Sequence, residues 1–421
     1  MKTISRRLYE KIKLLIIATS KILLECRKSK LKRRREIALL LLDCEKEISE
    51  LPEVRACAET MISDVAIATN LSLDVGISVE KLVIEQVYVS YLRSFLFQYF
   101  QKVNDIVFDK EVFGLQYAKF EEYLYSDSIK YIIIAPLAGF KNGVDVIELQ
   151  KNLRIRRTSK EEIDRLGKPR HPFLPSIIDP MDASALKYAL EASFSHRKGS
   201  PENIRIIDKE FEGVVTVLRL FKSGTVDFFF TQQMPLLWSR YGGIAYRFKK
   251  RSGYLFLNYN LGKEEVDDFV ELWKELGHTI VNEDFHGHKY LRIAVIRFNL
   301  GSEEKDLENK LIDFFVAFEA LLLLETLELS YKLALRTATL LGESPKEKKE
   351  IFNFMREAYV LRSRIVHGKI PKIRKKIIDL KDYVPRLEDY LRRSIVKYLR
   401  MTIDFANQKD ILDSLNQKIL E

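Results

Sequence analysis

The stretch from Ser344 to Pro371 constrains the fold of this chain most tightly, because it holds both ends of one helix. Ser344 is a favourable N-cap, Pro345 suits the first helical position, and Glu347 completes a capping box. Apolar residues then recur on one face at helical spacing, namely Ile351, Phe354, Met355, Ala358, Leu361 and Ile365. Gly368 and Pro371 supply the stop signals. The pattern predicts a buried helix that ends close to residue 368.

Two side chains near the end of this helix have the chemistry of a phosphate site. Arg362 carries a permanent charge, and His367 titrates near neutral pH at a helix end whose dipole favours the protonated imidazole. Together they can bind a phosphate and move a proton. The spacing by itself is weak support, because Arg165 and His171 have a similar spacing in a proline-rich loop.

The composition is that of an ordinary globular protein with an excess of positive charge. The 421 residues suggest two or three domains, with 47% hydrophobic and 31% charged residues. The net charge of +10 favours an anionic partner such as nucleic acid or an acidic membrane surface, or else reflects a lysine-rich solvated surface. Cys26, Cys44 and Cys57 fit reduced intracellular thiols. No apolar run reaches the ~18 uncharged residues that span a bilayer, so we expect a cytoplasmic protein with no membrane segment.

Apolar spacing predicts three regions and an α+β, multidomain fold. Residues 1–125 form an N-terminal helical region, residues 126–290 a β-rich middle domain, and residues 291–421 an all-α helical bundle. The helices of the first region break near residues 28–32 and at Pro52.

The middle domain is expected to consist mainly of short strands. These are residues 131–135, 144–149, 153–157, 204–208, 213–221, 225–231, 243–249 and 254–259. Thr158 with Glu161 suggests a cap that opens a short helix, and residues 182–195 and 264–276 suggest further helices. Residues 291–298 fit either a strand or the start of a helix.

One long helical pattern follows Ser302 and continues to Gly342. Charged residues interrupt its apolar face at Glu319, Glu325, Glu328 and Arg336. Charges that face inward need partners, and Arg362 is a natural one. In this structural alternative Arg362 ties two helices together and His367 merely caps a helix end.

A second group of histidines has little resemblance to a metal site. His278, His286 and His288 lie beside Glu283 and Asp284, but their spacing fits no established zinc pattern. The glycines around them suggest a loop. Surface histidines are the default interpretation, and we expect no metal and no cofactor.

Several segments of the C-terminal third occur in a recognisable order. They are Ala294-Val-Ile-Arg-Phe298, Ile312–Leu321, Glu325, Leu333–Leu341, Tyr359, Arg362–Gly368 and Leu391–Ile395. This order resembles the HEPN superfamily, and more closely the Apea-like HEPN proteins. The most specific part is the string Arg-Ser-x-x-Val-His-Gly on a predicted helix, after the Phe-Glu-Ala-Leu helix.

The resemblance implies a helical domain that usually dimerises. In many members an Arg-x4–6-His pair cleaves RNA without a metal, and by position Arg362 and His367 are that pair. The residues expected to bind substrate are Ser363, Arg364 and Lys369, and those expected to support the site are Glu319, Glu325 and Arg336. Some members are scaffolds or nucleotide-binding modules instead.

The residue types fit RNA cleavage. The 2′-OH must lose a proton and the 5′ leaving oxygen must gain one, and histidine serves either step near neutral pH. Arginine stabilises the charge that develops on the phosphorane oxygens. The basic run Lys369, Lys372, Arg374, Lys375 and Lys376 either holds the strand or is a solvated helix start. Because the motif offers one imidazole, a symmetric dimer would supply the second.

The sequence therefore predicts a metal-independent endoribonuclease that acts on RNA as a homodimer through its C-terminal helical domain, in a toxin or antiphage defence setting. Two alternatives stay open. One is a non-catalytic HEPN module that binds RNA or nucleotide. The other is a structural interaction protein, which an Arg362 deeply buried against Glu319 or Glu325 would favour.

Overall fold

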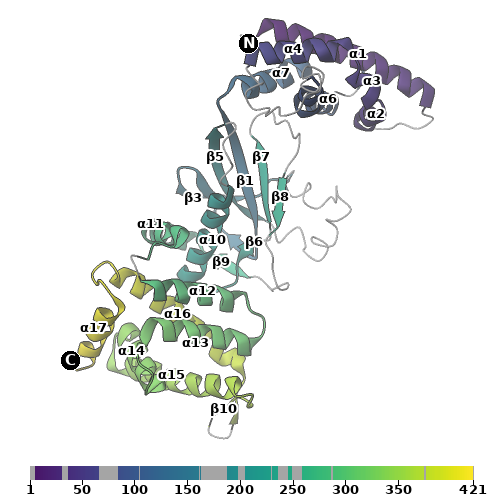
Figure 1. The fold of residues 1–421 in the computed structure, drawn as a ribbon. Helices are drawn as coiled ribbons and strands as arrows, with labels where there is room; N and C mark the ends of the chain where they lie inside the picture. The colour runs from purple at the N-terminus through teal and green to yellow at the C-terminus, as the bar shows by residue number, and fades with distance from the viewer. Residues whose placement is uncertain are drawn as a thin grey trace, which may run out of the picture. The chain divides into compact units, whose positions relative to one another are not determined.

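The computed structural model describes residues 5–30, 37–65, 84–103, 105–160, 162, 187–197, 204–228, 230–235, 245–248, 258–285, 288–373 and 376–420. The chain divides into two compact units, 1–133 with 193–202 and 232–246, and 134–192 with 203–231 and 247–421. Helices come first along the chain, then a sheet region, then helices again (Figure 1). The predicted mixed α/β class and this order of regions are confirmed, while the boundaries at residues 125 and 290 stay predictions.

The first unit opens with a set of helices around an aromatic core. They are α1 (Arg6–Lys30), α2 (Ile37–Asp43), α3 (Glu45–Ser49), α4 (Pro52–Val65), the π-helix η2 (Tyr88–Leu92), α6 (Arg93–Phe100) and α7 (Lys110–Tyr125). The predicted break at Pro52 is confirmed, since α4 begins there. The predicted break at residues 28–32 coincides with the end of α1 at Lys30, and its last two residues lie outside the described ones. Phe95, Phe113 and Phe120 pack ring against ring in the core, so burial of aromatic surface stabilises this unit. The described helices of the whole chain include none with an apolar stretch long enough to cross a membrane.

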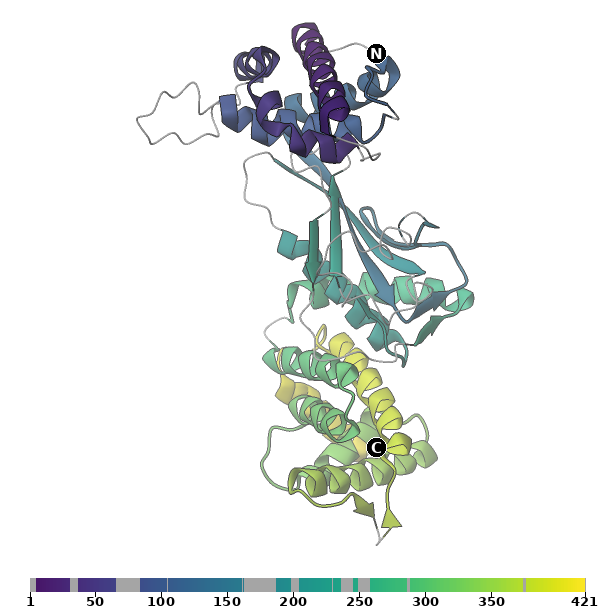
Figure 2. The same cartoon turned by 90° about the vertical axis from the view of Figure 1, so that its right-hand side faces the viewer.

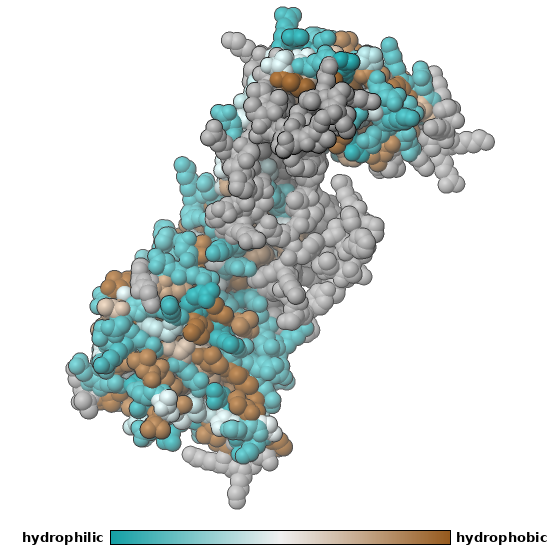
Figure 3. All heavy atoms as spheres, in the orientation of Figure 1, coloured by the Kyte–Doolittle hydropathy of each residue, from teal (hydrophilic) through white to brown (hydrophobic). Residues whose placement is uncertain are grey.

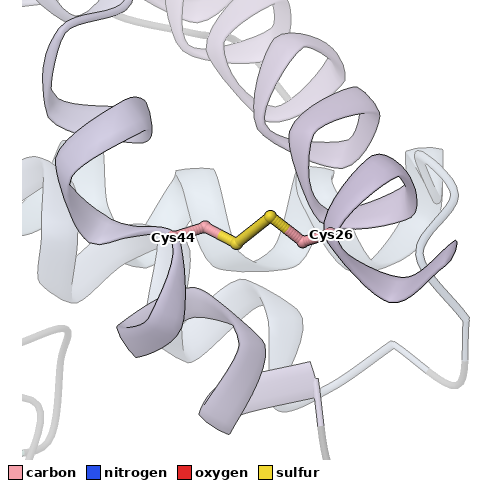
Figure 4. The surroundings of a disulfide bond; sticks show 2 residues. All are labelled: Cys26 and Cys44. Atoms are coloured by element: carbon pink, nitrogen blue, oxygen red, sulfur yellow. A yellow bond between two sulfur atoms is a disulfide. The ribbon is translucent and has the colours of Figure 1, made fainter. Parts of the chain in front are cut away.

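The prediction of three reduced thiols is wrong for two of them. The structure joins Cys26, near the end of α1, to Cys44, between α2 and α3, in a disulfide bond (Figure 4). The two residues are 18 apart in sequence, but the packing of α2 beside α1 brings them together. Cys57 is free and buried, and burial raises the pKa of its thiol to about 12.

The described strands of the main sheet have the order β3-β4-β5-β1-β7-β8, with β6 paired to β1. Their bounds are β1 (Ser128–Ala138), β3 (Val146–Gln150), β4 (Leu153–Arg157), β5 (Tyr188–Arg197), β6 (Asp227–Phe228), β7 (Phe230–Pro235) and β8 (Ala245–Phe248). Strands β2 (Phe140–Asn142) and β9 (Tyr259–Leu261) pair separately and in parallel. The predicted strands at 131–135, 144–149 and 153–157 are confirmed, with β3 and β4 antiparallel.

Two predictions in this region are wrong. Residues 188–197 form strand β5 rather than part of a helix, because the segment lies between β4 and β1 in the sheet and residues 188–192 are buried. Residues 204–221 form helix α10 (Ile204–Phe221) rather than two strands. Its β-branched residues imitate strand composition, yet Phe211, Val214 and Leu218 are all buried at helical spacing.

The predicted helix cap after β4 lies one residue later than expected. The Ser159 hydroxyl accepts a hydrogen bond from the Glu162 N–H, and the Glu162 carboxylate accepts one from the Ser159 N–H. The cap is therefore Ser159 with Glu162, instead of Thr158 with Glu161, which itself lies outside the described residues.

The second unit continues with helices that lead to the C-terminal part of the chain (Figures 1 and 2). They are the short η4 (Lys263–Glu265), α11 (Val266–Asn282), α12 (Lys289–Glu303), α13 (Leu307–Leu322), α14 (Leu329–Leu341), α15 (Pro345–Val366), α16 (Leu380–Met401) and α17 (Gln408–Leu420). Residues 291–298 belong to a helix, and the pattern from 302 to 342 is two helices with a break between them. Glu328 ends that break in the left-handed conformation, with a φ of 57°.

Helix α17 completes the bonding of two earlier helices. The side-chain amide of Gln408 donates hydrogen bonds to the carbonyls of Ala320 and Leu321, at 2.7 and 3.0 Å, which lie at the C-terminal end of α13. Asn416 accepts a hydrogen bond from the Arg336 guanidinium of α14. The two bonds from Gln408 satisfy backbone carbonyls that a helix end leaves without intrahelical partners, whereas the bond to Asn416 joins two side chains.

Candidate functional site

Helix α15 has the start and the buried face that its sequence predicts. The Ser344 hydroxyl accepts a hydrogen bond from the Glu347 N–H, while the Glu347 carboxylate accepts one from the Glu343 N–H. The predicted core residues Ile351, Phe354, Met355, Ala358 and Leu361 are buried. Ile365 lies only partly buried, in the last turn of the helix. The buried face therefore ends before the candidate histidine.

A Schellman motif terminates α15 and fixes the position of His367. Gly368 has a φ of +66°, which only glycine adopts without strain, and its N–H donates to the carbonyl of Ile365 at 2.9 Å. The Lys369 N–H donates to the carbonyl of Arg364 at 2.8 Å. His367 is thus the C-cap residue, and its side chain is exposed to solvent.

Arg362 contacts Glu319 of α13 through one long hydrogen bond. The distance between Arg362 Nη2 and Glu319 Oε2 is 3.4 Å, and each side chain is 24% exposed. Arg362 Nε and Glu319 Oε1 are both shielded from solvent, and neither has a hydrogen-bond partner among the described residues. Arg362 is therefore neither free in solvent nor locked in a well-formed internal ion pair.

Tyr359 completes this small cluster. The Arg362 guanidinium lies 5.7 Å from the centre of the Tyr359 ring, and the ring packs edge-on against Phe315 of α13. Burial raises the pKa of the Tyr359 phenol, and the negative charge of Glu319 raises it further against the opposing effect of Arg362. Sequence reasoning assigned Tyr359 no role at the site, although its place one helical turn before Arg362 puts the two side chains on one face.

Glu325 and Arg336, predicted to support the site, bind each other instead of Arg362. Arg336 donates to both carboxylate oxygens of Glu325, at 2.7 and 2.9 Å, and to the carbonyl of Leu322 at 2.7 Å. Arg336 is only 4% exposed. The guanidinium lowers the pKa of Glu325 to about 2. This pair joins α14 to the segment that follows α13, so it stabilises the helical unit. Arg362 contacts Glu319 and not Glu325.

The two candidate catalytic side chains differ in their surroundings. Five residues along an α-helix rotate the side-chain direction by about 140°. Arg362 accordingly points toward α13, whereas His367 lies at the exposed end of α15. Of the predicted substrate-binding residues, Ser363 and Arg364 are partly buried and Lys369 is exposed. Arg364 donates from Nε to the carbonyl of Ile370 at 2.8 Å, which supports the turn after the helix.

The basic run after the helix forms a short hairpin. Strands β10 (Lys372–Ile373) and β11 (Lys376–Ile377) pair antiparallel directly after the turn that ends α15 (Figure 2). The interpretation of this run as a helix start is wrong. Lys369, which precedes the hairpin, is exposed, whereas Arg374 and Lys375 of the basic run lie outside the described residues. Ile370 and Ile377 are also exposed.

The second histidine group does not come together as a cluster. His288 is buried and its Nδ1 lies 2.9 Å from the hydroxyl of Tyr290, whereas His278 is exposed on α11. His286 lies outside the described residues. Among the residues that the structure describes, no three His, Cys, Asp or Glu side chains are grouped as metal ligands would be.

Comparisons of the chain with models of protein families, with curated proteins and with solved structures find no match. The resemblance to HEPN proteins therefore stays a prediction from the sequence.

Proposed function

We propose that this protein is a metal-independent endoribonuclease of the HEPN type, in which Arg362 binds the scissile phosphate and His367 transfers a proton. The observation that carries the proposal is the state of Arg362. Its guanidinium is partly exposed and makes one 3.4 Å hydrogen bond, and Nε has no hydrogen-bond partner within the described part of the chain. A purely structural arginine in the same bundle, Arg336, is instead buried and donates four hydrogen bonds. Arg362 thus retains hydrogen-bond capacity for an anion.

The chemistry needs only these residue types and the substrate. The 2′-OH attacks the neighbouring phosphorus, the P–O5′ bond breaks, and a 2′,3′-cyclic phosphate and a 5′-hydroxyl form. Arg362 offers a planar, permanently charged edge to the phosphorane oxygens. His367 is exposed, so its imidazole can exchange protons with the substrate and with water. The basic hairpin β10–β11 supports binding of the adjoining strand by charge attraction.

The complete site in this proposal forms between two copies of the chain. The motif of one copy supplies one imidazole, whereas the turnover needs an acid as well as a base. The C-terminal helices carry apolar side chains on their surface (Figure 3), and those exposed on α12 and α15 include Ile293, Ile296, Leu300, Val360 and Val366. A two-fold contact through α15 would bury Val360 and Val366 and bring two imidazoles and two guanidinium groups together.

The direct test is incubation of the purified protein with total RNA. The wild-type chain should produce discrete fragments, and His367→Ala should produce none while keeping its fold. His278→Ala is the matched control, because it removes an exposed helical imidazole elsewhere in the same unit and should leave cleavage unchanged. Equal cleavage by all three proteins would refute the assignment of His367.

The basic hairpin also favours one alternative, an RNA-binding module without cleavage. In that case the wild-type protein and His367→Ala would bind RNA equally well, and neither would cut it.

A further inference from the structure

We propose that Glu319 is an exchangeable counter-ion of Arg362, which holds the guanidinium in the free protein and releases it to a phosphodiester group of the substrate. This inference rests on the proposed function, because it concerns the same arginine. It assigns Glu319 a role in setting anion affinity, where the sequence suggested only structural support.

Glu319 binds only part of the hydrogen-bonding edge of the Arg362 guanidinium. The Nε–H and one Nη2–H of arginine form one edge, which matches the two oxygens of a carboxylate or phosphate. Glu319 occupies only Nη2 of this edge, at 3.4 Å, and Nε has no partner in the described parts of the structure. Its own Oε1 is likewise unpartnered among the described residues. Two opposite charges that lie this close without bidentate bonding are joined weakly.

A second glutamate–arginine pair in the same helical unit shows what a complete ion pair looks like here. Glu325 and Arg336 form the bidentate pair that Glu319 and Arg362 do not, at 2.7 and 2.9 Å. Arg336 has further bonds to Leu322 and Asn416, and its side chain is nearly inaccessible. The two pairs share residue types and neighbouring helices but differ in completeness. Only the Arg362 pair leaves donors for a competing anion.

An anion from solvent has partial access to the Arg362 guanidinium. Arg362 Nε is shielded from solvent in the present arrangement, while the side chains of Arg362 and Glu319 each remain 24% exposed. An anion can therefore approach the guanidinium from outside, but reaches the full Nε–Nη2 edge only when Glu319 moves aside. The adjacent Tyr359 ring keeps the guanidinium in place during this exchange.

The test measures binding of a short fluorescent RNA with 2′-O-methyl riboses, which cannot be cleaved by attack of the 2′-oxygen. Glu319→Gln keeps the shape of the side chain and removes its charge, so the Kd should fall by about threefold or more relative to wild type. Adding Arg362→Ala should abolish this gain. Glu319→Asp, which keeps the charge but shortens the reach, should also bind more tightly and serves if the glutamine variant does not fold.

Two matched variants control for net charge. Glu325→Gln makes the same charge change next to Arg336, whose remaining bonds keep it from an anion, and Glu328→Gln does so at an exposed position. Both should bind the RNA with nearly the wild-type Kd. The inference is overturned if Glu319→Gln binds no better than Glu328→Gln, or if no variant binds the RNA at all. A tighter Kd for Glu319→Gln in a protein that never cuts unmodified RNA would refute the nuclease and uphold the exchange.

Discussion

Arg336 and Glu325 meet through two parallel hydrogen bonds, 2.9 Å from Nη1 and 2.7 Å from Nη2, at the break between α13 and α14. We expect this pair to contribute more to the free energy of unfolding than the loose contact of Arg362 with Glu319 does. Arg336→Ala removes four hydrogen bonds and leaves the carbonyl of Leu322 without its partner, although Lys332 stays 3.6 Å from Glu325, so it should cost about 3–5 kcal/mol. Arg362→Ala should cost less, about 1–3 kcal/mol, because it removes one long hydrogen bond but leaves the partly buried carboxylate of Glu319 without its cation.

Urea unfolding of both variants, with the wild type beside them, measures this difference. An Arg362→Ala protein as unstable as Arg336→Ala would show that Arg362 is an internal ion-pair partner, and would remove the main support for the nuclease.

The same pair predicts a loss of stability in acid. The pKa of Glu325 is lowered from 4.5 to about 2, mainly by its hydrogen bonds with Arg336. A carboxylate with a depressed pKa in the folded state stabilises the fold above its unfolded pKa and loses this contribution as the pH falls toward the folded value. The wild-type protein should therefore lose stability relative to Glu325→Gln between about pH 4.5 and about pH 2. Thermal melts across this range measure the difference, and parallel curves for the two proteins would contradict the expectation.

Cleavage should persist in excess EDTA. If Arg362 and His367 carry the reaction, the products should have 2′,3′-cyclic phosphate and 5′-hydroxyl ends, and DNA should stay intact because it lacks the 2′-OH. End-labelling of the fragments before and after phosphatase treatment identifies the termini. Activity that disappears with chelator and returns with zinc or magnesium would point to a different mechanism.

Gly368→Ala should disturb the end of α15. The residue has a φ of +66°, and although its Cβ would meet no atom within 4 Å, a side chain there costs about 1 kcal/mol of backbone strain. The turn that orients His367 and the hairpin should shift, so kcat should fall clearly while the melting temperature changes little. Gly114, a helical glycine that also has no atom near its added Cβ, provides the control, because Gly114→Ala should be neutral or stabilising.

Activity should depend on association of two chains. Val360→Asp and Val366→Asp place charges at two exposed positions of α15 and should shift the protein to monomers with little loss of stability. The sedimentation coefficient and the specific activity of the wild-type protein should fall together as it is diluted. A monomer at micromolar concentration that cuts RNA at full specific activity would sink the dimeric site.

The sequence predicted α15 well because its information is local. The cap at Ser344, the buried face from Ile351 to Leu361 and the stop at Gly368 each follow from neighbouring residues. The prediction failed where distant contacts decide. Tyr188–Arg197 has helix-forming residues but lies between two strands, and Ile204–Phe221 has strand-like composition but buries one helical face.

The sequence did not indicate which glutamate pairs with which arginine at the site, because these pairs join residues that are distant in the chain. Glu319 and Glu325 were equal candidates for Arg362, since both follow the same apolar pattern. The break after Leu322 moves Glu325 off the helix, where Arg336 binds it. Nothing in the spacing of these residues indicates that break, because the apolar residues continue through it.

The bonds made by α17 set an order in which the helical unit can be completed during synthesis. Translation is vectorial, so α13, α14 and α15 leave the ribosome before Gln408 and Asn416 exist. Until then the carbonyls of Ala320 and Leu321 lack the amide that later binds them, and Arg336 lacks its contact with Asn416. The nascent chain therefore carries Arg362 and His367 on an unfinished scaffold, and the candidate site acquires its full support only after residue 416 has left the ribosome.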